Sequence, residues 1–114
     1  MELIGRLRKL APQVELDWST KTAIMVRYPG VQVRLGKIVT SYPQGLRVEI
    51  QTPAGAVTPT QIERLGQHRE IRNHRGLDWV TFWIRGTADV HPEEFALVVR
   101  AGLGLVGMKW VPQE

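Results

Sequence analysis

The sequence predicts a single α+β domain in which one mainly antiparallel sheet of about six strands carries helices on one face. A chain of 114 residues is long enough to bury one independent core. Strand-like segments follow one another directly, and helical patterns stand at the two ends and in the middle, giving the order α-β-β-β-β-α-β-β-α. Strands that are neighbours in sequence favour an antiparallel sheet over a parallel one. Residues 1–114 are therefore expected to form one domain.

The chain begins with an amphipathic pattern that predicts a helix. Its apolar residues recur at helical spacing and Pro12 ends the pattern. The apolar face consists of Leu3, Ile4, Leu7, Leu10 and Ala11.

Four segments with period-two alternation follow and predict strands. Turn-forming residues separate them at Ser19-Thr20, Pro29-Gly30 and residues 42–45. The apolar positions are Val14, Leu16 and Trp18; Ile24, Val26 and Tyr28; Val31, Val33 and Leu35; and Leu46, Val48 and Ile50. The residues between them are polar, so one side of this sheet is expected to pack and the other to face water.

A short second helix is predicted from Thr58 to about Leu65. Thr58 suits the N-cap, Pro59 the first helical position, and Gln61 completes a T-x-x-Q capping box. Gly66 suits the left-handed position that ends a helix.

The segment from Gly66 to Ile84 predicts a basic and aromatic β-hairpin with Arg75-Gly76 near its turn. A final helix is then expected to begin at Pro92, with Glu93 and Glu94 favourably placed in its first turn. This helix is apolar nearly all round, so it is expected to be heavily buried.

Alternation from Asp78 to Arg85 divides the side chains into two sets: Val80, Phe82 and Ile84, and Trp79, Thr81, Trp83 and Arg85. In one interpretation the tryptophans lie on an open sheet face, where they can stack on nucleic-acid bases. In the other they fill the core, as large aromatic side chains usually do. The sequence leaves both open.

Arginines near these tryptophans suggest a surface for phosphates, since guanidinium offers a planar fork of donors. The net charge of +4 agrees with this but is also common on ordinary proteins. The predicted nucleic-acid-binding set is Arg27, Arg34, Arg47, Arg69, Arg72, Arg75, Trp79, Trp83 and Arg85. The alternative for Arg27, Arg34 and Arg47 is a solvated face with cross-strand pairs to Asp17 and Glu49.

Nothing in the sequence has the spacing of a catalytic, metal or cofactor site. Cysteine is absent, the three histidines do not form a metal set, and no G-x-S-x-G motif or phosphate-binding loop is present. The amino terminus lacks the pattern of a signal peptide, and the apolar stretch Phe95–Val106 is shorter than the ~20 residues of a membrane span. We therefore expect no enzyme, no cofactor, no metal and no membrane insertion.

Two stretches carry a family resemblance: LRKLAPQVELDWSTKTAIMVRYPGVQVRLGK from Leu7, and IERLGQHREIRNHRGLDWVTFWI from Ile62. With the terminal apolar helix, they resemble the carboxy-terminal extension found on some damage-recognition ATPases of the bacterial excinuclease ABC complex, over about Leu7 to Val106. The pattern is also similar to small α+β domains of the MmcQ/YjbR type, which have been proposed to bind DNA.

The resemblance implies a cytoplasmic accessory domain of nucleotide excision repair that acts on DNA together with other repair subunits. That family's ATPase loop and zinc-binding cysteines have no counterpart here, so no catalytic or metal residue carries over. A protein-interaction module is the alternative, docking on a repair partner or self-associating through residues 102–111 or an exposed aromatic patch.

Overall fold

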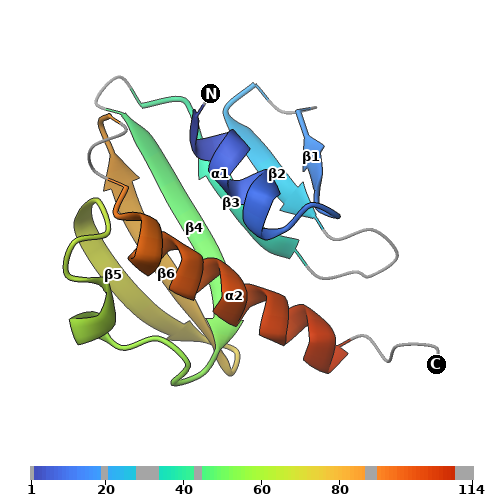
Figure 1. Cartoon of the computed structure of the whole chain (residues 1–114), viewed down its shortest axis with the longest axis vertical. Helices are drawn as coiled ribbons and strands as arrows, with labels where there is room; N and C mark the ends of the chain where they lie inside the picture. Colours follow the sequence, from blue (N-terminus) through green and yellow to red (C-terminus); the bar gives the residue numbers. More distant parts are fainter. Residues whose placement is uncertain (1, 19–20, 28–33, 43–44, 87–89, 110–114) are drawn as a thin grey trace.

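A computed structural model describes residues 2–18, 21–27, 34–42, 45–86 and 90–109 (Figure 1). In chain order the elements are α1 (Glu2–Leu10), β1 (Glu15–Asp17), β2 (Ala23–Arg27), β3 (Arg34–Val39), β4 (Leu46–Pro53), the 3₁₀ helix η1 (Pro59–Ile62), β5 (Gln67–His74), β6 (Leu77–Ile84) and α2 (Pro92–Lys109). The strands form one antiparallel sheet in the order β1-β2-β3-β4-β6-β5. The predicted α+β class is therefore confirmed.

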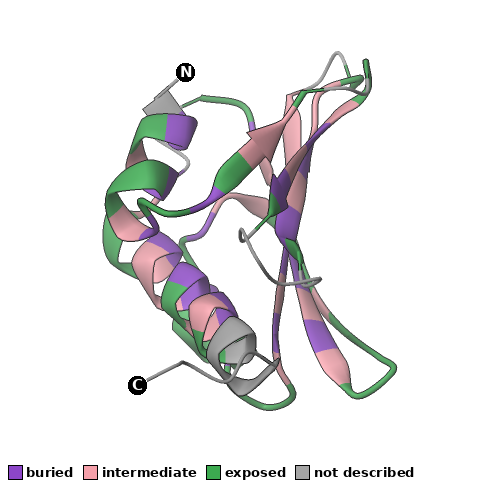
Figure 2. Ribbon diagram, turned by 90° about the vertical axis from the view of Figure 1, so that its right-hand side faces the viewer, coloured by how far each residue is buried: buried purple, intermediate pink, exposed green. Residues whose placement is uncertain are grey.

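Both α-helices lie on the same side of the sheet, and no described helix covers its other face (Figure 2). Helix α1 buries Leu3, Ile4 and Leu7, as its apolar spacing predicts. Helix α2 runs diagonally across the sheet and packs mainly on β4 (Figure 1). This layering creates one core and one open face.

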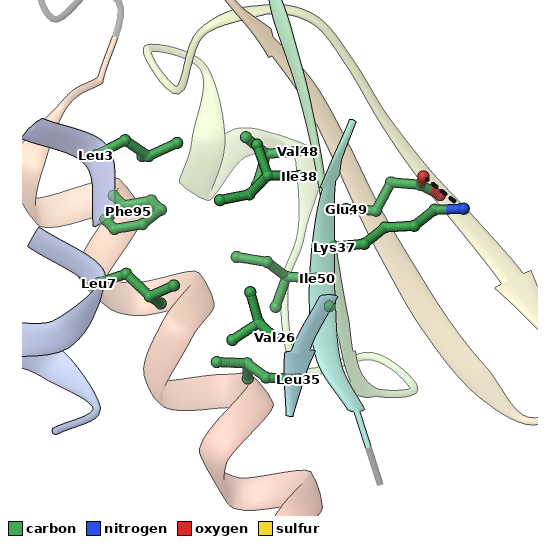
Figure 3. Close-up of a pocket in the computed structure, with 11 residues that line it drawn as sticks. Leu3, Leu7, Val26, Leu35, Lys37, Ile38, Val48, Glu49, Ile50 and Phe95 are labelled. Atoms are coloured by element: carbon green, nitrogen blue, oxygen red, sulfur yellow. Dashed lines mark ion pairs between the residues drawn. The ribbon is translucent and has the colours of Figure 1, made fainter. Parts of the chain in front are cut away.

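The core lies between the helices and the inward side chains of the strands. Figure 3 shows Leu3, Leu7 and Phe95 facing Val26 and Ile38 across it. The space left between these side chains is only about 10 Å³, which holds at most one water molecule. The helix-covered side of the sheet is thus filled by side chains.

Helix α2 approaches the sheet closely at Gly102. A Cβ atom there would lie 2.4 Å from Leu35 Cδ1 and 3.0 Å from the carbonyl oxygen of Gln51. Phe95, Val98 and Val99 of the same helix are fully enclosed, whereas Leu97 and Leu103 are half-buried. The prediction of a heavily buried helix holds for its sheet-facing side; the side chains of residues 105–109 lie outside the described part.

The third strand differs from its prediction. The alternation placed it around Val31, Val33 and Leu35, but β3 runs from Arg34 to Val39, and residues 31–33 lie outside the described part of the chain. A register shift opposite Val26 and Arg27 breaks the period of two, so that Leu35 and Ile38, three residues apart, both face the core. The bulge therefore shifts the alternation on which the prediction rested.

The second helix is shorter than predicted and consists of a single 3₁₀ turn, Pro59–Ile62. The capping interaction is present: the Thr58 backbone N–H donates to Gln61 Oε1 at 2.9 Å. Leu65 instead pairs in a β-bridge with Val90, which ends the helical segment early.

The hairpin turn is confirmed at Arg75-Gly76. Both residues have left-handed backbone, with φ of 56° and 79°, and His74 pairs with Leu77 on either side of them. Positive φ at both central positions is the signature of a two-residue turn whose twist matches that of the strands.

Asp78 ties the start of β6 to the loop after β4. Its carboxylate accepts a 2.9 Å hydrogen bond from the Gly55 N–H and a 3.1 Å bond from Asn73 Nδ2, and the group is buried. Replacing Asp78 by alanine would leave the Gly55 N–H without this acceptor, and we expect a loss of about 1–3 kcal/mol in the free energy of unfolding.

Urea denaturation of Asp78→Ala measures this loss. Asn73→Ala, which removes one donor and keeps the carboxylate, is the control and should cost less than Asp78→Ala. A change below about 0.5 kcal/mol, the usual range for surface substitutions, would contradict the structural role of Asp78.

Candidate nucleic-acid interface

The open face of the sheet is the candidate interface, and strand alternation decides which side chains reach it. Val80, Phe82 and Ile84 of β6 belong to the core, so Trp79 and Trp83 lie on the opposite, open face. The charged residues whose registers place them there are Arg27, Arg34, Lys37, Arg47 and Arg72, and Glu15, Asp17, Glu49 and Glu70. We call this set, with the two tryptophans, the open face.

Charge on the open face is mixed, with five basic and four acidic side chains. Arg27 Nη2 lies 3.3 Å from Asp17 Oδ2, and Lys37 Nζ lies 3.5 Å from Glu49 Oε2. Figure 3 shows this second pair on the side of the sheet away from the core. The predicted pairing of Arg27 with Asp17 is thus present, while Glu49 pairs with Lys37 instead of an arginine.

Arg72 pairs with Glu70, two residues earlier on the same strand and face. The hydrogen bond from Arg72 Nε to the Glu70 carboxylate, and then the attraction between the two charges, raise the pKa of the Arg72 guanidinium. Arg72 is largely exposed, so water screens the pair and its net contribution to stability is small.

Two arginines of the open face have no carboxylate partner among the described residues. The Arg34 guanidinium contacts the Met25 sulfur at 3.9 Å. Arg47 is half-buried between Val39 and Trp83 on the neighbouring strands, and its Nε is buried without a hydrogen-bond acceptor in the described part of the chain. An anion that binds either of these two arginines therefore displaces no described carboxylate.

Both tryptophans are half-buried, and each has a distinct setting. Trp83 packs against Tyr42 with ring centroids 4.7 Å apart and planes inclined by 60°. Trp79 borders a hollow of about 60 Å³ that Arg34, Lys37 and Gln51 also line. The interpretation that puts the tryptophans on the open face is the one the structure supports.

Three of the predicted residues lie outside the paired strand positions that define the open face. Arg69 sits in a shallow groove of about 300 Å³ between η1 and β5 and donates a 2.6 Å hydrogen bond to the Gly66 carbonyl. Arg75 is in the hairpin turn, and Arg85 follows β6 at its other end. The eight residues of β6, at about 3.3 Å each, separate these two ends by roughly 26 Å.

Six of the nine predicted residues lie on the open face, and the structure adds Lys37 and Tyr42 to them. The six are Arg27, Arg34, Arg47, Arg72, Trp79 and Trp83. Lys37 was missed because the alternation ended the third strand at Leu35, before the bulge. Tyr42 stood in a turn-forming segment, and only the tertiary fold brings it to Trp83. The pairing of Glu70 with Arg72 had a signal in the sequence, since residues two apart on a strand share a face.

Within the described residues, no cluster of three or more His, Asp or Glu side chains is arranged to hold a metal ion. No described helix combines the length and apolar character needed to cross a membrane. Comparison with models of known protein families, with curated proteins and with solved structures finds no match.

Proposed function

We propose that this chain is a non-enzymatic accessory domain of a repair protein similar to the damage-recognition ATPase of excinuclease ABC, and that its open face contacts DNA. One observation carries the DNA contact: a sheet face without helices groups five basic side chains with two tryptophans. The repair setting, the cytoplasmic location and the other excision-repair subunits as partners rest on the sequence resemblance from Leu7 to Val106.

The mixed charge of the open face makes this contact weak. Arg34 and Arg47 can bind phosphate without breaking an ion pair with a described carboxylate. Arg27 and Arg72 must instead exchange their carboxylate partners, Asp17 and Glu70, for a phosphate. An exposed ion pair contributes only ~0–1 kcal/mol, so this exchange is nearly neutral. Roughly two or three phosphates are then neutralised, which predicts a log–log salt slope of about −2 to −3 on duplex DNA.

Titration of fluorescein-labelled duplex and single-stranded DNA at two salt concentrations tests the proposal. We expect binding by fluorescence anisotropy at low salt and its loss as salt rises. Absence of binding to either form at low salt would refute the proposed DNA contact.

Removing a competing carboxylate is expected to strengthen binding. Glu70→Gln frees Arg72 on the open face, and one added phosphate contact is worth about 1 kcal/mol in water, or about fivefold in affinity at low salt. The salt slope on duplex DNA should steepen by about 0.9.

Glu93→Gln is the matched control, because it removes the same charge from an exposed residue in the first turn of α2, on the helix layer. Equal gains for both variants would assign the effect to net charge and contradict a specific role for the open face.

A protein-binding role is the second candidate, and the groove between η1 and β5 favours it. β5 is an edge strand, and an extended segment of a partner or a second copy can add to such an edge. Glu63, Arg69 and Glu70 line this groove, so a partner of complementary charge would bind less tightly to Glu70→Gln. The sign of the Glu70→Gln effect thus separates the two candidates.

A further inference from the structure

The two tryptophans of the open face form two separate aromatic sites. They are four residues apart on β6, which places them on one face roughly 13 Å apart. Trp83 shares its site with Tyr42, which remains 39% exposed, and Trp79 borders the hollow beside Arg34. Both sites therefore combine an aromatic ring with a nearby guanidinium, Arg47 in the first case and Arg34 in the second.

Duplex DNA cannot use these sites, because its bases are stacked inside the helix and only phosphates and groove edges face a flat protein surface. Unpaired bases, by contrast, can stack on aromatic side chains whatever their sequence. Phosphate contacts alone would favour duplex over single-stranded DNA, because the duplex carries the higher charge density and its binding depends more steeply on salt. A preference for single-stranded DNA therefore indicates that base stacking dominates binding, and a preference for the duplex indicates that phosphate contacts dominate.

We propose that the open face binds single-stranded DNA by stacking unpaired bases at Trp83–Tyr42 and at Trp79. This inference rests on the proposed DNA contact and specifies its form. Arg34 and Arg47 hold the backbone through charge-assisted contacts from their guanidinium groups to phosphate oxygens. The Gln51 amide beside Trp79 offers both a donor and an acceptor to the edge of a base.

Three labelled probes with equal numbers of phosphates separate stacking from charge. They are a single strand of about 12 thymidines, within the usual site size, an abasic strand of the same length, and a hairpin duplex. The full chain is expected to bind the thymidine strand more tightly than the other two. Trp83→Ala and Trp79→Ala should each weaken thymidine binding by roughly 5- to 150-fold and leave binding to the abasic strand nearly unchanged.

Trp18→Ala is the matched control, because this tryptophan is 59% exposed but follows β1, at the far edge of the sheet from β6. Its thymidine affinity should equal that of the unchanged chain. Trp83→Phe keeps a stacking ring and should recover most of the affinity lost by Trp83→Ala. Circular dichroism and thermal unfolding verify that each variant is folded.

The outcomes separate this inference from the proposed function. Tighter binding to the thymidine strand that depends on Trp79 and Trp83 supports stacking. Equal or tighter binding to the duplex and the abasic strand, unaffected by the tryptophan variants, overturns stacking and leaves the DNA contact in place. Absence of binding to every probe at low salt overturns both.

Discussion

Replacing Phe82 by alanine is expected to lower the free energy of unfolding by about 3–5 kcal/mol. The Phe82 side chain is 0% exposed and meets Phe95 of α2 edge-to-face, with ring centroids 6.4 Å apart and planes inclined by 80°. The substitution removes the largest fully buried side chain of the sheet and leaves a cavity between two rigid elements. A domain of this size has only ~5–15 kcal/mol of stability, so much of it would be lost.

Chemical and thermal denaturation measure this effect. At about 4 °C per kcal/mol, the midpoint of thermal unfolding should fall by roughly 12–20 °C. Phe82→Leu keeps most of the apolar volume and should cost less. A double-mutant cycle with Phe95→Ala should show a coupling of ~0.5–1.5 kcal/mol from the edge-to-face pair.

The result also tests the orientation of the candidate interface. Side chains alternate along β6, so an enclosed Phe82 requires that Trp79 and Trp83 point to the open face. A loss below about 1 kcal/mol would show that Phe82 is not enclosed, and the proposed surface would then lack its tryptophans.

Local patterns predicted most of the fold because local forces form those elements. The apolar face of α1, the proline at the start of α2 and the Arg75-Gly76 turn each depend on residues close together in sequence. The bulge in β3 depends on pairing with β2, a non-local contact, so the alternation alone mispredicted that strand.

The face of the sheet on which Trp79 and Trp83 lie could not be decided from β6 alone, because both sets of its side chains contain large apolar residues. Pairing with β4 decides it: Val48 and Ile50 stand opposite Phe82 and Val80 and share their burial. Register between strands is set by the whole sheet. Charge pairing is equally non-local, as the contact of Lys37 with Glu49 on the next strand shows.

Replacing Gly36 by alanine is expected to destabilise the protein by about 3 kcal/mol, the upper end of the usual cost of overpacking. A Cβ atom at this position would lie 1.9 Å from the carbonyl oxygen of Glu49 and 3.0 Å from the Ile50 Cα, both in the backbone of β4. No rotamer change relieves such a contact, so β3 and β4 would have to separate. These strands lie in the middle of the sheet, where separation also disturbs the hollow beside Trp79.

Gly104→Ala supplies the matched control, because it adds the same methyl group at an exposed position of α2 where no described atom outside the helix's own backbone lies within 4 Å. Alanine favours the helix over glycine by about 1 kcal/mol, so this variant should be more stable than the parent. The two substitutions are thus expected to shift the urea midpoint in opposite directions. If Gly36→Ala has the urea midpoint of the parent, β3 and β4 approach less closely than the structure shows. That result would also contradict the placement of Lys37 and Arg34 beside Trp79.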